Sequence, residues 1–125
     1  MAGKRLTPLY TENSAANLYT IRTFLGEEGR TAFDRLLDRI IDDLVPALCE
    51  FPRSGRAFLA HPIRSLEARR AVRRLKRSLQ PGDDLREFIV GEYLLLYLIR
   101  GRQVVFLSIK HHRQLSFDLD RFWAQ

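Results

Sequence analysis

The sequence predicts an α+β domain in which a helical hairpin and a basic third helix pack on a small antiparallel sheet. Three observations support this prediction. Before residue 80, apolar residues recur at helical spacing and are interrupted at glycines and prolines. After residue 84, the pattern changes to extended apolar runs separated by glycine-containing pairs. A length of 125 residues with 46% apolar residues suits one hydrophobic core, so we expect a single domain over residues 1–125.

The chain begins with a short candidate strand at residues 6–11 (LTPLYT), whose proline restricts it to a sheet edge or a strand start. The first helix follows, with Asn13 or Ser14 as its expected cap. It extends to about Glu28, and Gly29 ends it. The short glycine-containing link to the next helix predicts a helical hairpin.

The second helix has the clearest pattern in the chain. Thr31 and Asp34 are spaced as in a capping box. Its apolar residues follow the i, i+3, i+4, i+7 rule and are Phe33, Leu36, Leu37, Ile40, Ile41, Leu44, Val45 and Leu48. Pro46 is expected to kink or shorten the last turn, because proline lacks the N–H donor that a helix interior needs.

A loop at residues 51–58 (FPRSGRAF) leads into a basic third helix over residues 65–79. From Arg64 to Arg77 the chain carries seven Lys and Arg residues against Glu67 alone, so the whole net charge of +6 belongs to this segment. Cations four residues apart on a helix repel each other by about 0.2–0.5 kcal/mol per pair. We therefore expect the helix to contact an anionic partner, such as RNA phosphates or an acidic protein segment. The alternative is a solvated surface helix.

Three strands follow at residues 85–92, 93–100 and 103–111. The links around Gly91–Glu92 and Gly101–Arg102 are short enough to force antiparallel hairpins. The middle strand is apolar on both faces. We therefore expect it at the centre of the sheet, with helices covering at least one side.

The last strand runs directly into a cationic segment, LSIKHHR. Strict alternation along the strand predicts two sets of side chains on opposite faces. One face carries Val105, Leu107, Ile109 and His111, and the other carries Val104, Phe106, Ser108 and Lys110. The closing turn from Lys110 to Arg113 is expected at an open rim, where an anionic macromolecule can dock.

Composition excludes several kinds of site. Cys49 is the only cysteine, which excludes an intramolecular disulfide and a multi-cysteine zinc site. The longest apolar run, Tyr93–Ile99, is too short for a membrane span, which needs about 20 residues. The first residues do not resemble a secretory signal, so we expect a cytoplasmic protein without membrane contact. The chain has no glycine-rich phosphate loop, and Asp118 and Asp120 have no nearby ligand partners, so we expect neither a cofactor nor a metal.

The order of these elements resembles that of the RelE/ParE toxins of bacterial type II toxin–antitoxin pairs, from about Thr7 to Arg113. The stretches that carry the resemblance are FPRSGR and LREFIVGEYLLLYLIRGRQVVFLSIKHHR. The family's Pro-x-x-Gly-Arg turn corresponds to Pro52, Gly55 and Arg56. The family's arginine at the start of the second strand corresponds to Arg86, and its Gly/Asp-x-Tyr motif at the entry to the third corresponds to Gly91–Tyr93. Its terminal His-x-Arg or His-Arg motif corresponds to His111, His112 and Arg113.

Resemblance to the ribonuclease branch of this family implies metal-independent cleavage of messenger RNA in the ribosomal decoding site. In that interpretation Lys110 and Arg113 hold the phosphate, with Arg86 contributing from the adjacent strand. His111 or His112 acts as acid or base, because histidine titrates near neutral pH. Structural alternatives are equally open: His111 as a hydrogen-bonded residue at a strand end, and Lys110 and Arg113 as solubilising cations.

Resemblance to the other branch implies a toxin that poisons DNA gyrase by binding it, without chemistry. Leu94 favours this branch, because many members carry an arginine there, whereas Lys110, His112 and Arg113 favour the ribonuclease branch. Both branches imply a cognate antitoxin that covers the basic cluster and the helical hairpin. A further alternative is a non-enzymatic nucleic-acid-binding module that uses the arginine-rich helix. The predicted nucleic-acid or partner contacts on that helix are Arg69, Arg70, Arg73, Arg74 and Arg77.

Overall fold

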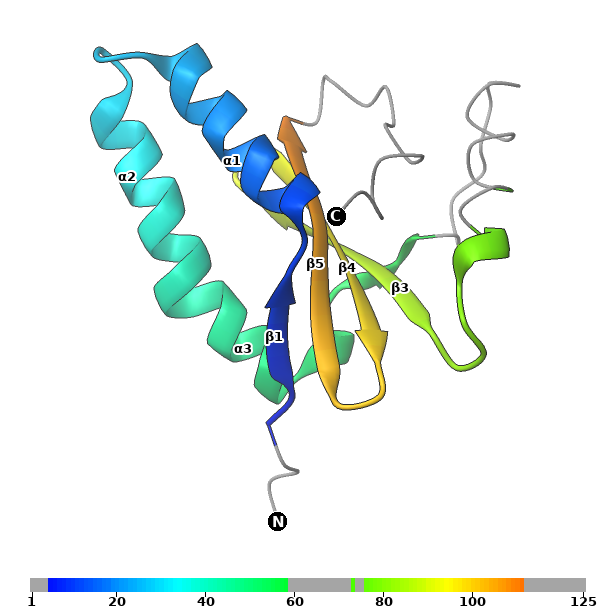
Figure 1. Cartoon of the computed structure of the whole chain (residues 1–125). Coiled ribbons are helices and arrows are strands. Elements are labelled where there is room, and N and C mark those ends of the chain that lie inside the picture. Colours follow the sequence, from blue (N-terminus) through cyan, green and yellow to red (C-terminus); the bar gives the residue numbers. More distant parts are fainter. Residues whose placement is uncertain (1–4, 59–72, 74–75, 112–125) are drawn as a thin grey trace.

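The computed structural model describes residues 5–58, 73 and 76–111, and it shows helices packed on a five-stranded sheet (Figure 1). This arrangement confirms the predicted α+β class. The elements in chain order are β1 (Thr7–Tyr10), α1 (Glu12–Leu25), α2 (Arg30–Asp38), η1 (Arg39–Leu44), α3 (Val45–Glu50), η2 (Pro52–Ser54), β2 (Arg56–Ala57), β3 (Asp84–Val90), β4 (Tyr93–Arg100) and β5 (Gln103–His111). Here η1 is a π-helical stretch and η2 is a single 3-10 turn.

The sheet contains the three predicted antiparallel strands, the predicted short strand near the start of the chain and one strand that was not predicted. Its order is β1-β5-β4-β3-β2. β3, β4 and β5 are joined by two-residue turns at Gly91–Glu92 and Gly101–Arg102, as predicted. Gly91 and Gly101 have φ angles of 57° and 58°, and no described non-glycine residue has a positive φ, which is the pattern of type II′ turns. β1 lies at an edge, as predicted, but it runs parallel to β5, so the complete sheet is mixed. The two-residue β2 at the opposite edge is not predicted by the sequence pattern.

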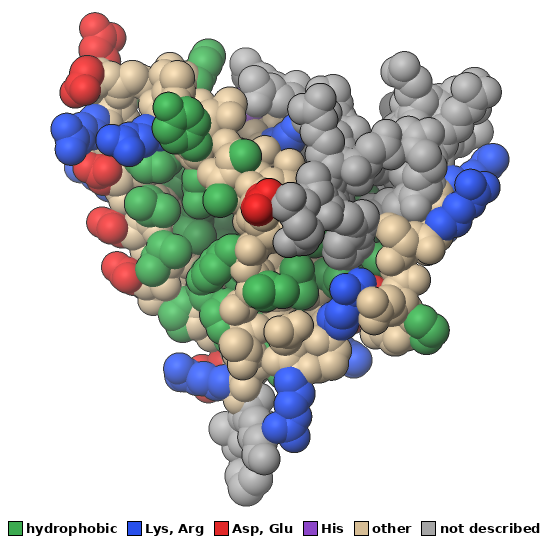
Figure 2. Space-filling model, viewed as in Figure 1, with side chains coloured by type: hydrophobic (Ala, Val, Ile, Leu, Met, Phe, Trp, Pro, Cys, Tyr) green, Lys and Arg blue, Asp and Glu red, His purple; other side chains and the backbone are tan. Residues whose placement is uncertain are grey.

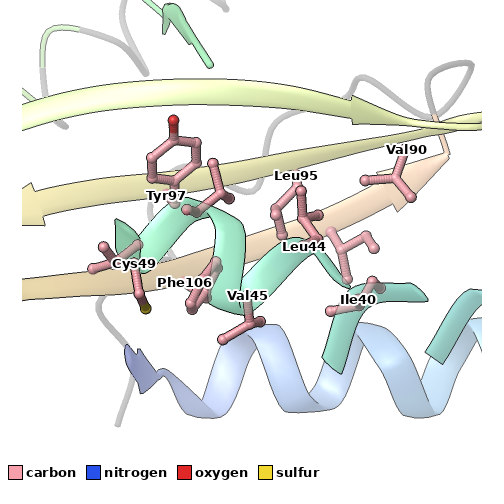
Figure 3. Packing of buried hydrophobic residues seen from close by; sticks show 11 residues of the cluster. Ile40, Leu44, Val45, Cys49, Val90, Leu95, Tyr97 and Phe106 are labelled. Atoms are coloured by element: carbon pink, nitrogen blue, oxygen red, sulfur yellow. The ribbon is translucent and has the colours of Figure 1, made fainter. Parts of the chain in front are cut away.

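The hydrophobic core lies between the sheet and the helical segment from η1 to α3 (Figure 3). Its labelled members are Ile40, Leu44, Val45 and Cys49 from that segment and Val90, Leu95, Tyr97 and Phe106 from the strands. β4 occupies the centre of the sheet, as predicted. Its neighbouring residues Tyr97 and Leu98 point to opposite faces, and both are fully buried. Strand β4 is therefore covered on both sides.

The helix caps differ from those predicted. Thr11 caps α1, because its Oγ1 accepts a hydrogen bond from the N–H of Ser14 at 3.2 Å. Asn13 instead directs its side-chain amide to the carbonyl of Leu107, so it is not available as a cap. The helix ends at Leu25, earlier than predicted, and Gly26 follows with a φ of 64°.

The second predicted helix is present, but its capping box is not formed. Gly29 is the N-cap of α2, without a side-chain hydrogen bond, and Thr31 lies inside the helix. Pro46 does not end the helical segment. The turn before it widens to a π-helix, in which the N–H of Val45 donates to the carbonyl of Ile40. Pro46 then lies in the first turn of α3, where its missing donor is tolerated.

A β-bulge corrects the predicted faces of β5. Leu96 pairs with Ser108 but Tyr97 pairs with Phe106, so Leu107 is an extra residue in the strand. Phe106 and Ile109, three residues apart, therefore both face the core. His111 shares this face with Ile109, as predicted, but Phe106 also belongs to it, whereas Val105 does not.

Two cross-strand partners, Arg86 and Tyr97, hold the turn that follows α3. The Tyr97 hydroxyl donates to the carbonyl of Pro52 at 2.7 Å and accepts from the N–H of Gly55 at 2.9 Å. Burial raises the pKa of Tyr97, so the hydroxyl keeps the proton that it donates. A Cβ at Gly55 would overlap the carbonyl oxygen of Glu87 and the Tyr97 hydroxyl, so glycine is required there by close approach.

Replacing Tyr97 by Phe should destabilise the protein, because it leaves the Pro52 carbonyl and the Gly55 N–H without their partner in a buried place. The expected loss is about 1–3 kcal/mol in the free energy of unfolding, measured by urea denaturation. Tyr19→Phe is the matched control, since Tyr19 is 70% exposed. Equal stability of the two variants would contradict a supporting role for the Tyr97 hydroxyl.

An ion pair between Asp83 and Arg100 should make stability depend on pH. Arg100 donates to the two carboxylate oxygens of Asp83 at 2.9 and 2.7 Å, and this interaction lowers the pKa of Asp83. The pair therefore stabilises the fold above the ordinary Asp pKa of about 4, and the effect is lost as the pH falls through the lowered folded-state pKa.

Asp83→Asn should lower the free energy of unfolding by about 1–2 kcal/mol near neutral pH. The gap in urea midpoint between wild type and this variant should close on acidification. The matched control is Glu50→Gln, which removes the more exposed pair with Arg5 and should cost less than about 0.5 kcal/mol. A gap that stays constant down to pH 2 would rule out the Asp83 carboxylate as its source.

Candidate functional site

The closing turn from Lys110 to Arg113, called the cationic rim below, begins at the end of β5. Its described residues, Lys110 and His111, pair with the first residues of β4. Lys110 is opposite Leu94, and His111 is opposite Tyr93. Neighbouring residues of a strand point to opposite faces, so these two side chains are on different sides of the sheet. His111 lies on the side of the helices with Tyr93, and Lys110 lies on the other side. A single ligand can reach both only by contacting the end of the sheet.

His111 has two described neighbours from the β3–β4 turn region. Its Nε2 lies 3.4 Å from Oε2 of Glu92, whose side chain is 75% exposed. Its ring packs edge-on against Tyr93, with ring centroids 5.6 Å apart. The imidazole is itself 28% exposed, so it remains accessible for hydrogen bonding or proton transfer. This environment suits either a structural histidine or a general acid–base.

Arg86 is bound to the turn after α3 and lies away from Lys110. Its NH1 donates to the carbonyls of Gly55 at 2.7 Å and Arg53 at 3.3 Å, and its Nε donates to Asp84 at 3.0 Å. Lys110 is aligned, through Leu94, with a residue of β3 that lies about 10 Å along the strand from Arg86. The two side chains also start from opposite faces. The structure therefore does not bring Arg86 and Lys110 together.

The other predicted site residues are only partly described. Arg73 and Arg77 are exposed, and both are in a helical conformation. The remaining predicted residues, which are His112, Arg113, Arg69, Arg70 and Arg74, lie outside the described residues. The described part of the predicted third helix is thus short and has its cations on the surface.

An apolar groove, which the sequence pattern does not predict, lies between the helical hairpin and the sheet. It has a volume of about 190 Å³ and is lined by Tyr10, Ser14, Ala15, Leu18, Ile40, Ile41, Leu95, Phe106 and Ile109. Figure 2 shows hydrophobic side chains gathered on this face, with acidic side chains along the outer edge of the helices. Tyr10 and Ile41 are 49% and 46% exposed. The spacing of Ile41 in the second helix indicated an apolar position, but spacing does not tell whether another element covers it.

Within residues 5–58, 73 and 76–111, no group of three His, Cys, Asp or Glu side chains is arranged to hold a metal ion. None of the helices described there is long and apolar enough to cross a membrane. Cys49 is buried, and burial raises the pKa of its thiol.

Comparison with known proteins identifies the family. A comparison with curated proteins finds no match to this chain. The family described as "ParE toxin of type II toxin-antitoxin system, parDE" matches residues 9–116, from β1 past the end of β5. This match spans the groove, the turn after α3 that Arg86 and Tyr97 bind, and the described part of the cationic rim. The chain therefore belongs to the ParE toxin family of type II toxin–antitoxin systems.

Proposed function

We propose that this toxin inhibits growth by binding and poisoning DNA gyrase, and that its cognate antitoxin silences it by occupying the apolar groove. Family membership implies the antitoxin partner. The observation that supports the binding mechanism is the position of Arg86. Its guanidinium is engaged by the turn after α3, on the face opposite Lys110. A phosphate held by Lys110 would therefore lack Arg86 as a second cation. RNA cleavage would use such a cation to stabilise the negative charge that develops on the phosphate.

Leu94 supports the same mechanism. It lies opposite Lys110 and is 8% exposed, so an apolar side chain fills the place beside the cation. Lys110 and His111 then serve as recognition residues that attract an anionic surface, here the gyrase–DNA complex. Such a role requires charge and hydrogen-bond donors at the rim, but no matched acid and base.

Metal-independent RNA cleavage is the second candidate, and His111 is the observation that favours it. Its ring is partly accessible and has a carboxylate neighbour in Glu92, an arrangement that can orient an imidazole for proton transfer. In this mechanism Lys110 and Arg113 would hold the phosphate, with His111 or His112 as acid or base. A non-enzymatic nucleic-acid-binding module that uses the arginine-rich helix is the third alternative.

The antitoxin is proposed to dock in the groove because an exposed apolar surface needs a partner. Tyr10, Leu18 and Ile41 contribute apolar area there, and burial of such area is worth about 25 cal/mol per Å². The groove lies between a helix pair and a sheet, which suits the apolar side of an extended or helical segment. A segment in this position would also lie beside the hairpin, in agreement with the surface predicted for the antitoxin.

Expression of the toxin without its antitoxin should arrest growth, stop DNA synthesis and produce double-strand breaks while messages stay intact. Lys110→Ala should raise the inducer concentration needed for arrest by about tenfold, because it removes a recognition charge. Arg102→Ala is the matched control, since Arg102 is an exposed cation in the turn at the opposite end of β5. Cleaved messages with intact chromosomes would overturn the gyrase mechanism in favour of the ribonuclease. Normal growth with salt-sensitive duplex binding would favour the third alternative.

Ile41→Asp should prevent neutralisation by the antitoxin, because it places a carboxylate in the apolar groove. Cells that co-express this variant with the antitoxin should still arrest, and the purified pair should bind at least about 100-fold more weakly. Phe24→Asp provides a matched control, because Phe24 is 83% exposed on α1 and does not line the groove. Full neutralisation of both variants would argue against the groove as the docking site.

A further inference from the structure

At its end, β5 pairs with β4 on one edge only, and side chains of α1 bind the other edge in place of a second strand. β1 pairs with β5 from Gln103 to Phe106 and stops at Tyr10, where the chain turns into α1. Among the described residues, no strand accompanies β5 beyond Phe106 on this side. Backbone groups at an uncovered edge need other partners or solvent. The first turns of α1 provide these partners.

Three polar residues around the start of α1 make the contacts. Thr11 Oγ1 donates to the carbonyl of Phe106 at 2.9 Å and lies 3.3 Å from that of Leu107. Asn13 Nδ2 donates to the Leu107 carbonyl at 2.9 Å. The next contact comes one turn later in the helix.

Asn17 Oδ1 accepts from the N–H of Ile109 at 3.1 Å and from the Ser108 hydroxyl at 3.0 Å. Together with the contacts of Thr11 and Asn13, these bonds bracket Leu107, the extra residue of the bulge. The side chains of α1 thus satisfy the part of β5 in which the strand departs from regular pairing.

The bulge decides which side chains reach the two functional surfaces. With it, Phe106 and Ile109 both lie in the groove, and His111 packs against Tyr93. In a regular strand with Phe106 in its present place, the period of two would bring Ser108 and Lys110 to that face instead. The groove would then contain a hydroxyl in place of Ile109, and the two cationic-rim side chains would exchange sides.

We infer that Asn13 and Asn17 are positioning residues that hold the β5 bulge and, through it, fix both the apolar groove and the directions of Lys110 and His111. The functional part of this inference rests on the proposed roles of those two surfaces. Asn17 lies inside α1, where asparagine is less favourable than alanine by about 0.6 kcal/mol. Its hydrogen bonds across to β5 give a physical reason for a poor helix former at this place.

The test uses the full chain with four substitutions on α1, of which Asn13→Ala is the mildest. Asn17→Ala removes the acceptor while improving helix propensity, so any loss comes from the contact with β5 and not from the helix. Asn17→Asp replaces the amide oxygen by a carboxylate oxygen, which can accept the same two hydrogen bonds and should rescue the contact. Thr20→Ala is the matched control, because the Thr20 hydroxyl bonds only to Ala16 of its own helix among the described contacts.

Amide hydrogen exchange of Ile109 and the NMR ring contact between Tyr93 and His111 are the structural readouts. In Asn17→Ala, exchange of the Ile109 amide should accelerate by about tenfold and the ring contact should weaken. Asn17→Asp and Thr20→Ala should keep both readouts at wild-type values. Asn13→Ala, which removes one donor to Leu107, is a milder second variant and should change them in the same direction.

Growth arrest, measured in parallel, separates the inference from the proposed function. Loss of the ring contact together with at least a tenfold weaker arrest would support both. Loss of the ring contact with full arrest would support the positioning role and overturn the proposed role of the β5 end in toxicity. Unchanged exchange of Ile109 and an unchanged ring contact in Asn17→Ala and Asn13→Ala would overturn the positioning inference.

Discussion

The register of β5 is the constraint on which the rest of this structure depends, because a shift by one residue would exchange the side chains on its two faces. β4 pairs with β5 along its length, whereas β1 accompanies it only to Phe106. From there, Asn13 and Asn17 of α1 bind the backbone of the strand. Helix α1 therefore forms a wall of the groove and also satisfies the sheet edge beside it.

The turn after α3 illustrates how a residue with a suggestive position can have a supporting role. Arg86 and Tyr97 lie opposite each other on β3 and β4, and both bind the backbone of residues 52–55. Gly55 allows the close approach that these bonds require. A buried carbonyl or N–H without a partner costs about 1–3 kcal/mol, so this small set of contacts fixes the path of the chain from α3 into β2.

The proposed toxin has two surfaces of opposite chemistry that share one strand. Phe106 and Ile109 contribute to an apolar groove, and Lys110 and His111 form the cationic end that follows directly. Apolar burial supplies affinity without strong direction, whereas charge supplies attraction and orientation. An antitoxin segment in the groove would lie next to the surface proposed to recognise the target, which explains how one partner could silence the toxin.

The sequence by itself determined the α+β class, the helical hairpin, the two glycine turns of the sheet and the central place of β4, because periodicity and turn chemistry are local properties. It also placed Lys110 and His111 at a strand end. Only the tertiary structure decided that β1 runs parallel to β5, that Arg86 is engaged by a distant turn, and that a bulge at Leu107 changes the faces of β5. Those features depend on hydrogen bonds between residues far apart in the chain, such as Asn17 and Ile109, and no local pattern encodes them.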